Sequence, residues 1–468
     1  MTTIRITTTE GTDITVSCAE LVRRVAGKRT VYRGNLETSQ VFVKIFVNRS
    51  SKRRHFEAEL NGLQALTRAN IPAPEVLYTG QTDEDYPAIV SRAITNGISV
   101  EVAWKQQIDE NGRQTLIKQL LKVLALHHEA GLQHKDPHLK NFFVTSNAIY
   151  TLDGADISTG KTPLNKPASL QNLGLVLAQF QPSDDRRALN LLPSYCDARG
   201  WPMTPTLLQK IHETILQKRE WRKKRYLKKI YRECSQVVSL SESSSSQLME
   251  RAFDTPAMRD FLQQPDRFAG SGTAECVMLK DGNSSTVVQL QMSGDSFVVK
   301  RYNIKGSLHR LKRMFSRSRA ERCWENAHLL GFYGIPTAEP VAIRVDKTGP
   351  FRGRSWFIAQ HLPGQTLMQF ILDNRDNEKA LADIVVEVTN IIEGLQEQQI
   401  AHGDFKANNF QISQGKVYLI DLDSMEQHRD AASFEKAQQK DLTRFLQNWA
   451  SMSEVKELFL RALNGKDT

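Results

Sequence analysis

Apolar residues alternate along short runs in some segments of this chain and recur at helical spacing in others. Residues 279–300 (LKDGNSSTVVQLQMSGDSFVVK) contain two β-rich runs separated by Ser-Gly-Asp, which predicts a hairpin. Residues 50–66 and 318–332 carry apolar side chains at the spacing of an amphipathic helix, as do 172–180 and 440–449. Strands followed by helices predict an α+β fold with a cleft between a β-rich lobe and a helical lobe.

A pattern of polar residues occurs twice, 268 residues apart. In each copy an Asp is followed by an Asn five residues later, and a second Asp comes twelve residues after that Asn. The residues are Asp136, Asn141 and Asp153 in the first copy and Asp404, Asn409 and Asp421 in the second. Upstream, the prolines of ANIPAPEVL and YGIPTAEPV and the lysines of VFVKIF and FVVKRY also correspond, at offsets of 264 and 256. Offsets that drift in one direction indicate a duplicated domain.

The length of 468 residues also favours more than one domain. The serine-rich segment 237–250 (VVSLSESSSSQLME) has the composition of a linker. We therefore expect an N-terminal domain over 1–236, this linker, and a C-terminal domain over 251–468.

Composition indicates a soluble protein of a reducing compartment. Apolar residues make up 40% and charged residues 24%, which is ordinary for a globular chain. The five cysteines are odd in number and none are spaced as metal ligands, so we expect reduced thiols. The first residues lack a signal-peptide pattern, and no run of 18 apolar residues occurs. We expect a cytoplasmic protein.

The repeated residues suit phosphoryl transfer from ATP. That reaction needs a lysine on the nucleotide phosphates, oxygen ligands for Mg²⁺, and a carboxylate beside the attacking hydroxyl. Each copy offers these groups in that order: a Gly-containing turn, a strand lysine, a helix, and then the Asp/Asn loop. The turn glycines are Gly27 and Gly34 in the first copy and Gly282 in the second, and the lysines are Lys44 and Lys300.

At these residues the chain resembles the lipopolysaccharide core (Kdo/heptose) kinase family. The second copy resembles it most fully, through VVKRYNIKGSLHRLKRMFSRSRAERCWENAHLLGFYGIPTAEPVA, HGDFKANNFQI and YLIDLDSM. The first copy does so through VFVKIF, NIPAPEVLYTG and QHKDPHLKNFFV. The resemblance implies two tandem protein-kinase-like domains, each with a small β-rich N-lobe and a helical C-lobe. It also implies ATP and Mg²⁺ as cofactors and a Gram-negative source.

The resemblance assigns roles to the repeated residues. Lys44 and Lys300 would contact the nucleotide, with Gly282 in the turn above it. Asp136 and Asp404 would act as bases, and Lys406, two residues after Asp404, would contact the transferring phosphate. His138 stands at the position of Lys406 in the first copy. The metal ligands would be Asn141, Asp153, Asn409 and Asp421. The histidines before each base, His134 and His402, are expected to support the loop backbone.

The helix carboxylate that should pair with the strand lysine differs between the copies. Thirteen residues before the helix-ending proline lies Glu59 in the first copy and Cys323 in the second. Glu321 or Glu325 could reach Lys300 instead, or both could be solvated, or no ion pair forms. In the first copy Gly154 follows Asp153, which we expect to loosen that loop.

Net charge is +10, and basic residues gather in two runs, 218–232 and 305–322. Such runs are either solvated helix faces or contacts for an anionic partner. Trp221, Tyr226 and Tyr231 interleave with the first run, as in a helix lying on a membrane surface. No nucleic-acid-binding motif accompanies the charge. We expect peripheral contact with the anionic inner membrane, no nucleic acid partner, and no metal other than Mg²⁺.

The predicted function is phosphorylation of a heptose or Kdo sugar on the lipid A-linked lipopolysaccharide core. Two alternatives stay open. The acceptor could be a protein Ser, Thr or Tyr, because the fold does not fix the acceptor. One copy could instead be a pseudokinase that supports the other, given Cys323 in the second copy and His138 in the first.

Overall fold

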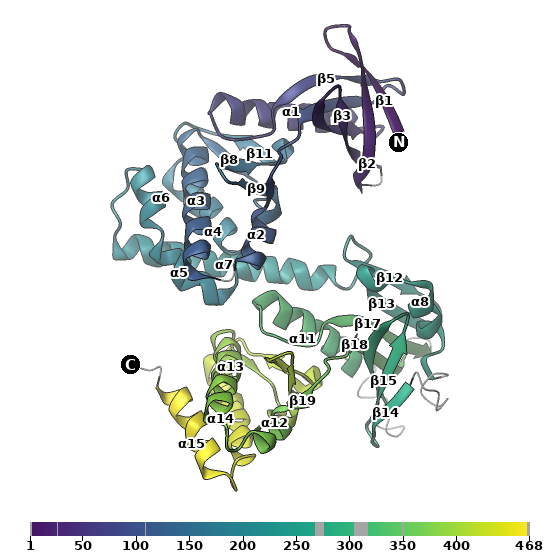
Figure 1. Cartoon of the computed structure of the whole chain (residues 1–468), viewed down its shortest axis with the longest axis vertical. Coiled ribbons are helices and arrows are strands. Elements are labelled where there is room, and N and C mark those ends of the chain that lie inside the picture. The colour runs from purple at the N-terminus through teal and green to yellow at the C-terminus, as the bar shows by residue number, and fades with distance from the viewer. Residues whose placement is uncertain are drawn as a thin grey trace. The chain divides into compact units, whose positions relative to one another are not determined.

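The computed structural model describes residues 2–25, 27–107, 109–266, 276–303, 317–348 and 351–465 (Figure 1). The chain divides into two compact units, Met1–Glu220 and Trp221–Thr468. The boundary falls inside the long helix α7 (Pro205–Lys229). Each unit places strands before helices, as the apolar pattern predicts.

The first unit begins with six strands that close into a barrel in the order β1-β2-β3-β4-β6-β5. The strands are β1 (Thr2–Thr8), β2 (Asp13–Val25), β3 (Arg29–Leu36), β4 (Ser39–Phe46), β5 (Val76–Thr82) and β6 (Pro87–Arg92). Along β4, Val41, Val43 and Ile45 are buried in the barrel core. Because successive strand side chains point to opposite faces, Lys44 lies on the outer face of the barrel.

Helix α1 (Lys52–Arg68) follows the barrel strand β4 and ends at a turn before β5. The rest of the first unit is mainly helical, with a core that includes Leu120, Leu124, Leu173, Tyr195 and Ile211. Its helices are α2 (Val100–Gln106), α3 (Glu110–Glu129), α4 (Lys166–Leu177), α5 (Asp185–Asn190), α6 (Pro193–Ala198) and α7. Short elements carry the polar loop: β7 (Gly97–Ser99), β8 (Leu132–His134), η1 (Leu139–Asn141), β9 (Phe142–Thr145), β10 (Ile149–Thr151), η2 (Gly154–Asp156) and β11 (Ile157–Thr159).

The second unit begins with a seven-stranded antiparallel sheet in the order β12-β13-β17-β18-β16-β15-β14. Its strands are β12 (Val237–Ser241), β13 (Ser245–Glu250), β14 (Cys276–Asp281), β15 (Ser285–Met292), β16 (Asp295–Tyr302), β17 (Pro340–Thr348) and β18 (Phe351–Gln360). Helix α8 (Pro256–Gln263) packs on the face that carries Val238 and Met249, and α11 (Arg319–Tyr333) packs on the face that carries Val237 and Leu248. The predicted hairpin is β15–β16, which turns at Ser293 and Gly294.

The segment 237–250 is a β-hairpin of this sheet, so its assignment as a linker is wrong. In the hairpin Val238 pairs with Met249, and Leu248 pairs in turn with Ile343 of β17. The apolar residues at the two ends of the segment are buried and set the structure, while most of the serines lie at or near the turn. The division between the units also comes earlier than the expected residue 236, at Glu220.

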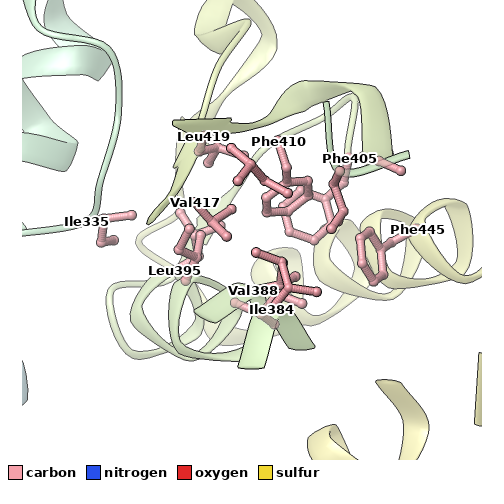
Figure 2. Packing of buried hydrophobic residues seen from close by; sticks show 14 of the residues in the cluster. Ile335, Ile384, Val388, Leu395, Phe405, Phe410, Val417, Leu419 and Phe445 are labelled. Atoms are coloured by element: carbon pink, nitrogen blue, oxygen red, sulfur yellow. The ribbon is translucent and has the colours of Figure 1, made fainter. Parts of the chain in front are cut away.

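The helical part of the second unit surrounds the loop at 400–410. Its helices are α12 (Leu367–Asp373), α13 (Glu378–Glu397), α14 (Ala431–Gln447) and α15 (Ser453–Asn464). Its short strands and turns are β19 (Gln365–Thr366), β20 (Ile400–Ala401), η5 (Ala407–Asn409), β21 (Phe410–Ser413), β22 (Lys416–Leu419), η6 (Leu422–Ser424) and β23 (Glu426–Gln427). Phe405 and Phe410 lie at the two ends of the polar part of the loop and pack beside Phe445 of α14 (Figure 2). These rings anchor the loop to the apolar core.

Candidate active sites

The strand lysine of the first unit lies between Glu59, its predicted helix partner, and Asp153, the predicted metal ligand. Lys44 Nζ donates to Glu59 Oε1 at 2.6 Å and to Asp153 Oδ1 at 3.0 Å. Glu59 belongs to α1 and is 2% exposed. Asp153 follows β10 in a left-handed backbone conformation, with φ of 59°. The predicted trio of Lys44, Glu59 and Asp153 is therefore brought together.

Because Gly154 has no side chain, the loop can pack directly against α1, so the expectation that this glycine loosens the loop is wrong. A Cβ on Gly154 would lie 2.3 Å from the carbonyl oxygen of Glu59, and one on Gly62 would lie 1.8 Å from the carbonyl oxygen of Gly154. The close approach lets the Glu59 carboxylate accept hydrogen bonds from the backbone N–H groups of Gly154 and Ala155, at 3.3 and 3.2 Å. Helix α1 is thus tied directly to the loop after Asp153.

A second cation, Arg29 at the start of β3, lies 3.5 Å from Asp153 Oδ2. Burial alone would raise the pKa of Asp153, but Lys44 and Arg29 outweigh it and lower the pKa to about 2. The carboxylate is therefore ionised at neutral pH, as a metal ligand must be. Sequence reasoning missed Arg29, because nothing in its spacing connects it with a residue more than a hundred positions away.

A cavity of about 320 Å³ opens beside these charges. Its apolar wall includes Val22, Val31, Phe42, Ile89 and Phe143, and its polar end includes the charged Lys44, Arg29 and Asp153 and the amide of Asn141. An apolar wall suits a flat aromatic base, and the charged end suits phosphates. A larger hollow of about 870 Å³ lies beside α1 and β5, and none of the predicted site residues line it.

The polar loop of the first unit lies between β8 and β9. Asn141 Nδ2 donates to the backbone carbonyl of Asp136 at 3.0 Å, which leaves its amide oxygen as the potential cation ligand. The Asp136 side chain is exposed. The buried His134 forms part of β8, and its carbonyl accepts a hydrogen bond from Asn172 of α4 at 2.7 Å. His134 thus lies in the backbone framework of the loop, as expected.

In the second unit the strand lysine pairs with two carboxylates of one loop. Lys300 Nζ donates to Asp421 Oδ1 and to Asp423 Oδ2, the latter at 3.3 Å. Asp421 has the same left-handed conformation as its counterpart, with φ of 63°. Asp423 is 6% exposed and also accepts a hydrogen bond from Arg319 at 2.5 Å. Burial raises the pKa of Asp423, but Lys300 and Arg319 have the larger effect and lower it.

Of the three alternatives for the helix partner of Lys300, the one in which no helix carboxylate pairs with it is confirmed, and the other two are wrong. Glu321 caps α11 at Ser318 and pairs with Arg352, and Glu325 binds Tyr231 and Arg317. Neither glutamate contacts Lys300 or is free in solvent, and the ion pairs of Lys300 are made with the loop residues Asp421 and Asp423 instead.

Cys323 lies in α11, at the position that the comparison of the two copies gives it. It is buried, and its Sγ lies 3.0 Å from the Tyr302 hydroxyl. Burial raises the pKa of its thiol to about 12, so Cys323 supplies no negative charge.

The predicted base of the second unit is surrounded by polar groups. Lys406 Nζ lies 2.8 Å from Asp404 Oδ1, and Arg444 of α14 lies 2.9 Å from the same oxygen. Asn409 Nδ2 donates to the Asp404 carbonyl at 2.7 Å. Burial acts to raise the pKa of Asp404, while Lys406, Arg444 and Asn409 together lower it. Asp404 is therefore ionised at neutral pH.

Backbone hydrogen bonds hold this loop in place. The buried carboxylate of Asp441 in α14 accepts from the N–H groups of His402, at 2.6 Å, and Gly403, at 3.1 Å. The His402 ring joins the loop to the strand before Asp421: Nε2 donates to the Ile420 carbonyl at 3.1 Å, and Nδ1 accepts from Asp404 N–H at 3.3 Å. Burial lowers the pKa of His402 and keeps it neutral. His402 has the supporting role predicted for it.

The glycines and the basic runs fall as follows. Gly27 and Gly282 lie in turns between strands, as predicted, whereas Gly34 lies within β3, where a Cβ would meet the Ser17 carbonyl oxygen at 2.4 Å. Of the run 305–322, residues 305–316 lie outside the described residues. Tyr226 and Tyr231 are hydrogen-bonded within the second unit, to His328 and to Glu325, so they are not part of an exposed membrane-facing surface.

Both loops fit a hard divalent cation with a nucleotide. Each supplies one carboxylate and one amide oxygen beside a lysine, and Mg²⁺ takes oxygen ligands while keeping several waters. Within the described residues no group of three or more His, Cys, Asp or Glu is placed to hold a metal ion by itself. Among the helices that the structure describes, none is long and apolar enough to cross a membrane.

No curated protein sequence matches this chain. Two solved structures that resemble it are mutant forms of the kinase domain of Mycobacterium tuberculosis PknI, each 14% identical to it. They cover 43% and 38% of this chain and 95% and 74% of their own, with TM-scores of 0.29 and 0.27. Likenesses at this level support no conclusion about the fold.

The sequence profile of the lipopolysaccharide kinase (Kdo/WaaP) family matches residues 9–158 and 277–461, which together make up well over half of the chain. The two matched ranges contain both strand lysines and both Asp/Asn loops. The chain therefore belongs to the lipopolysaccharide kinase (Kdo/WaaP) family, and it is a phosphotransferase that acts on an alcohol group.

Proposed function

We propose that the protein transfers the terminal phosphate of ATP to a heptose or Kdo hydroxyl of the lipopolysaccharide inner core, using two tandem protein-kinase-like domains. The observation that carries the proposal is the duplicated cluster of strand lysine, loop Asp and Asn, and final Asp within the family match. In both units these residues lie on corresponding elements, and the lysine pairs with the final Asp.

The residues divide the work of phosphoryl transfer. Lys44 and Lys300 hold the nucleotide phosphates, and Asn141, Asp153, Asn409 and Asp421 hold Mg²⁺, which when bound neutralises charge on the phosphates. Asp136 and Asp404 orient the sugar hydroxyl and accept its proton. Lys406 and Arg444 place two positive charges beside Asp404, where they stabilise negative charge in the transition state.

The second unit has the more complete base. Asn172 of α4 binds the backbone of the first loop, and Asp441 of α14 binds that of the second, so the two helices correspond. Three residues further along each helix, the first unit has Leu175 where the second has Arg444. His138 similarly replaces Lys406. The first unit has the complete lysine–glutamate pair and the nucleotide-sized cavity. This division favours the second unit as the faster catalyst, with the first as a nucleotide-binding domain that supports it.

A basic face on α7 supports docking on an anionic membrane surface. It consists of Trp221, Lys224, Arg225 and Lys228, whose spacing places them on one side of the helix. All four are exposed, and the Arg225 guanidinium lies 4.5 Å from the Trp221 ring. A lipid A-linked acceptor in the inner leaflet would lie at such a surface. We place the protein in the cytoplasm, peripheral to the inner membrane.

Incubation of the full-length protein with Mg-ATP and separate acceptors tests the function. Core saccharides ending in heptose, core saccharides ending in Kdo, and an unfolded protein substrate are compared by mass spectrometry. We expect one added phosphate on a core saccharide and none on the protein. Phosphate on the protein alone would contradict the proposed acceptor and support the protein-kinase alternative.

A further inference from the structure

In each unit the strand lysine and one arginine lie beside two carboxylates, so the two positive charges are balanced by two negative ones. In the first unit these are Lys44 and Arg29 with Glu59 and Asp153. In the second they are Lys300 and Arg319 with Asp421 and Asp423. The totals agree although the second carboxylate comes from a helix in one unit and from a loop in the other.

The two units differ at two facing positions, one on the helix and one on the loop. At each position one unit has a carboxylate and the other has an uncharged residue. On the helix, Glu59 of the first unit corresponds to Cys323 of the second, by their equal distance from the helix-ending proline. On the loop, two residues after the metal-binding Asp, Ala155 corresponds to Asp423. In the first unit these two positions touch, because the Ala155 N–H donates to Glu59.

The space between helix and loop explains the exchange. In the first unit α1 and the loop approach so closely at Gly62 and Gly154 that neither position has room for a side chain. The corresponding residue of α11 is Asn326, whose side chain donates to the loop carbonyls of Leu422 and Met425, at 2.8 and 3.0 Å. The asparagine occupies the space between the second helix and its loop, and the carboxylate comes from the loop side.

Cys323 does not stand in for the missing glutamate. It is 2% exposed and contacts the Tyr302 hydroxyl, at a position where the first unit has Phe46. A protonated thiol beside a lysine offers little electrostatic attraction. Asp423 is nearly as buried as Glu59, contacts the lysine, and is fixed on its other side by Arg319.

We propose that Asp423, held by Arg319, is the residue that positions Lys300, in place of the helix carboxylate of the first unit. The proposal rests on the nucleotide-binding role of Lys300 given under the proposed function. It makes the second unit a working site whose lysine is positioned from the loop, so that the absence of a helix glutamate does not mark it as inactive.

The test measures Mg-ATP binding by calorimetry in the full-length chain carrying Lys44→Ala, so that the second unit reports. The chain with both Lys44→Ala and Lys300→Ala serves as the blank. We expect Asp423→Asn to weaken ATP binding at least tenfold, with the unfolding temperature kept within a few degrees. Asp383→Asn, the same charge change at an exposed site of this unit, should leave binding unchanged.

The deciding variant rebuilds the arrangement of the first unit, Cys323→Glu with Asp423→Ala, and should recover most of the lost affinity. If this variant does not fold, Asp423→Glu replaces it and should bind within about threefold of the background, because the carboxylate is kept. Unchanged binding in Asp423→Asn, or loss without recovery in a folded rescue variant, overturns the proposal. Binding no better than the blank in Lys44→Ala alone contradicts the proposed function of the second unit, and the inference with it.

Discussion

Replacing Asp441 by asparagine should loosen the loop at 400–410 of the second unit without changing the loop's own sequence. One carboxylate oxygen accepts from His402 N–H at 2.6 Å, and both lie 3.1 Å from Gly403 N. Gly403 has a φ of 79°, and a Cβ there would meet the Ser424 carbonyl at 2.7 Å, so the loop has little freedom to adjust. An amide has one acceptor oxygen for two N–H donors, and its NH₂ group would face one of them.

The magnitude follows from the bonds lost. A hydrogen bond to a charged group contributes about 1.5–3 kcal/mol, and a buried donor left without a partner costs about 1–3 kcal/mol. The substitution should therefore destabilise the loop by roughly 3–5 kcal/mol. The first unit tolerates Asn172 at the corresponding place because that loop presents the His134 carbonyl, to which the amide donates.

Hydrogen exchange read by mass spectrometry on peptides covering 400–405 measures this effect directly. Since 1.4 kcal/mol corresponds to a factor of ten, we expect exchange of these amides to accelerate by at least about 100-fold. Phosphate transfer by the second unit should fall with it. Glu435→Gln, an exposed charge change on the same helix, is the control. Unchanged exchange at His402 and Gly403 in Asp441→Asn would refute the argument that this carboxylate holds the loop.

Three further predictions concern stability and the membrane. Gly62→Ala should destabilise the first unit by about 2–4 kcal/mol, because the new Cβ would lie 1.8 Å from the backbone oxygen of Gly154. Gly331→Ala, whose Cβ would meet open space, should not be destabilising, and equal denaturant midpoints for the two variants would contradict this. Burial lowers the pKa of His128 to about 4, below the value of about 6.5 for an unfolded histidine. The contribution of His128 to stability is therefore present above pH 6.5 and falls by about 2 kcal/mol between pH 7 and pH 5. His128→Gln should reduce the pH dependence of denaturation curves by this amount, and an unchanged slope would count against it. Reversing the three charges of the basic face to Glu should weaken sedimentation with anionic vesicles about 100-fold or more, at roughly 1 kcal/mol per charge removed, and equal binding would exclude that face.

The sequence predicted the parts of the sites that depend on local spacing. A lysine in an alternating strand and an Asp-x₄-Asn loop keep their geometry wherever the chain folds this way, and the repeat at a nearly constant offset distinguished them from chance. Lys44, Glu59 and Asp153 meet as predicted. The order of strands before helices was also predicted correctly, because the periodicity of apolar residues indicates which elements form.

The parts that could not be predicted depend on contacts between distant segments. Asp423 looked like the end of an apolar run, and its contact with Lys300 depends on how far α11 lies from the loop. Arg319 stood in a basic run, where nothing separated it from solvated neighbours. The hairpin at 237–250 was missed because the serine run dominated its composition, although the buried pairs Val238–Met249 and Leu248–Ile343 determine its structure.

Transfer of labelled phosphate from ATP to a purified core saccharide most directly tests the central claim that these loops are kinase sites. The wild type, Asp136→Ala, Asp404→Ala and the double variant are compared, with folding checked by thermal unfolding. We predict that Asp404→Ala loses at least about 100-fold, that Asp136→Ala loses less, and that the double variant has no transfer above background. A folded double variant that still phosphorylates the saccharide at the wild-type rate would contradict the account.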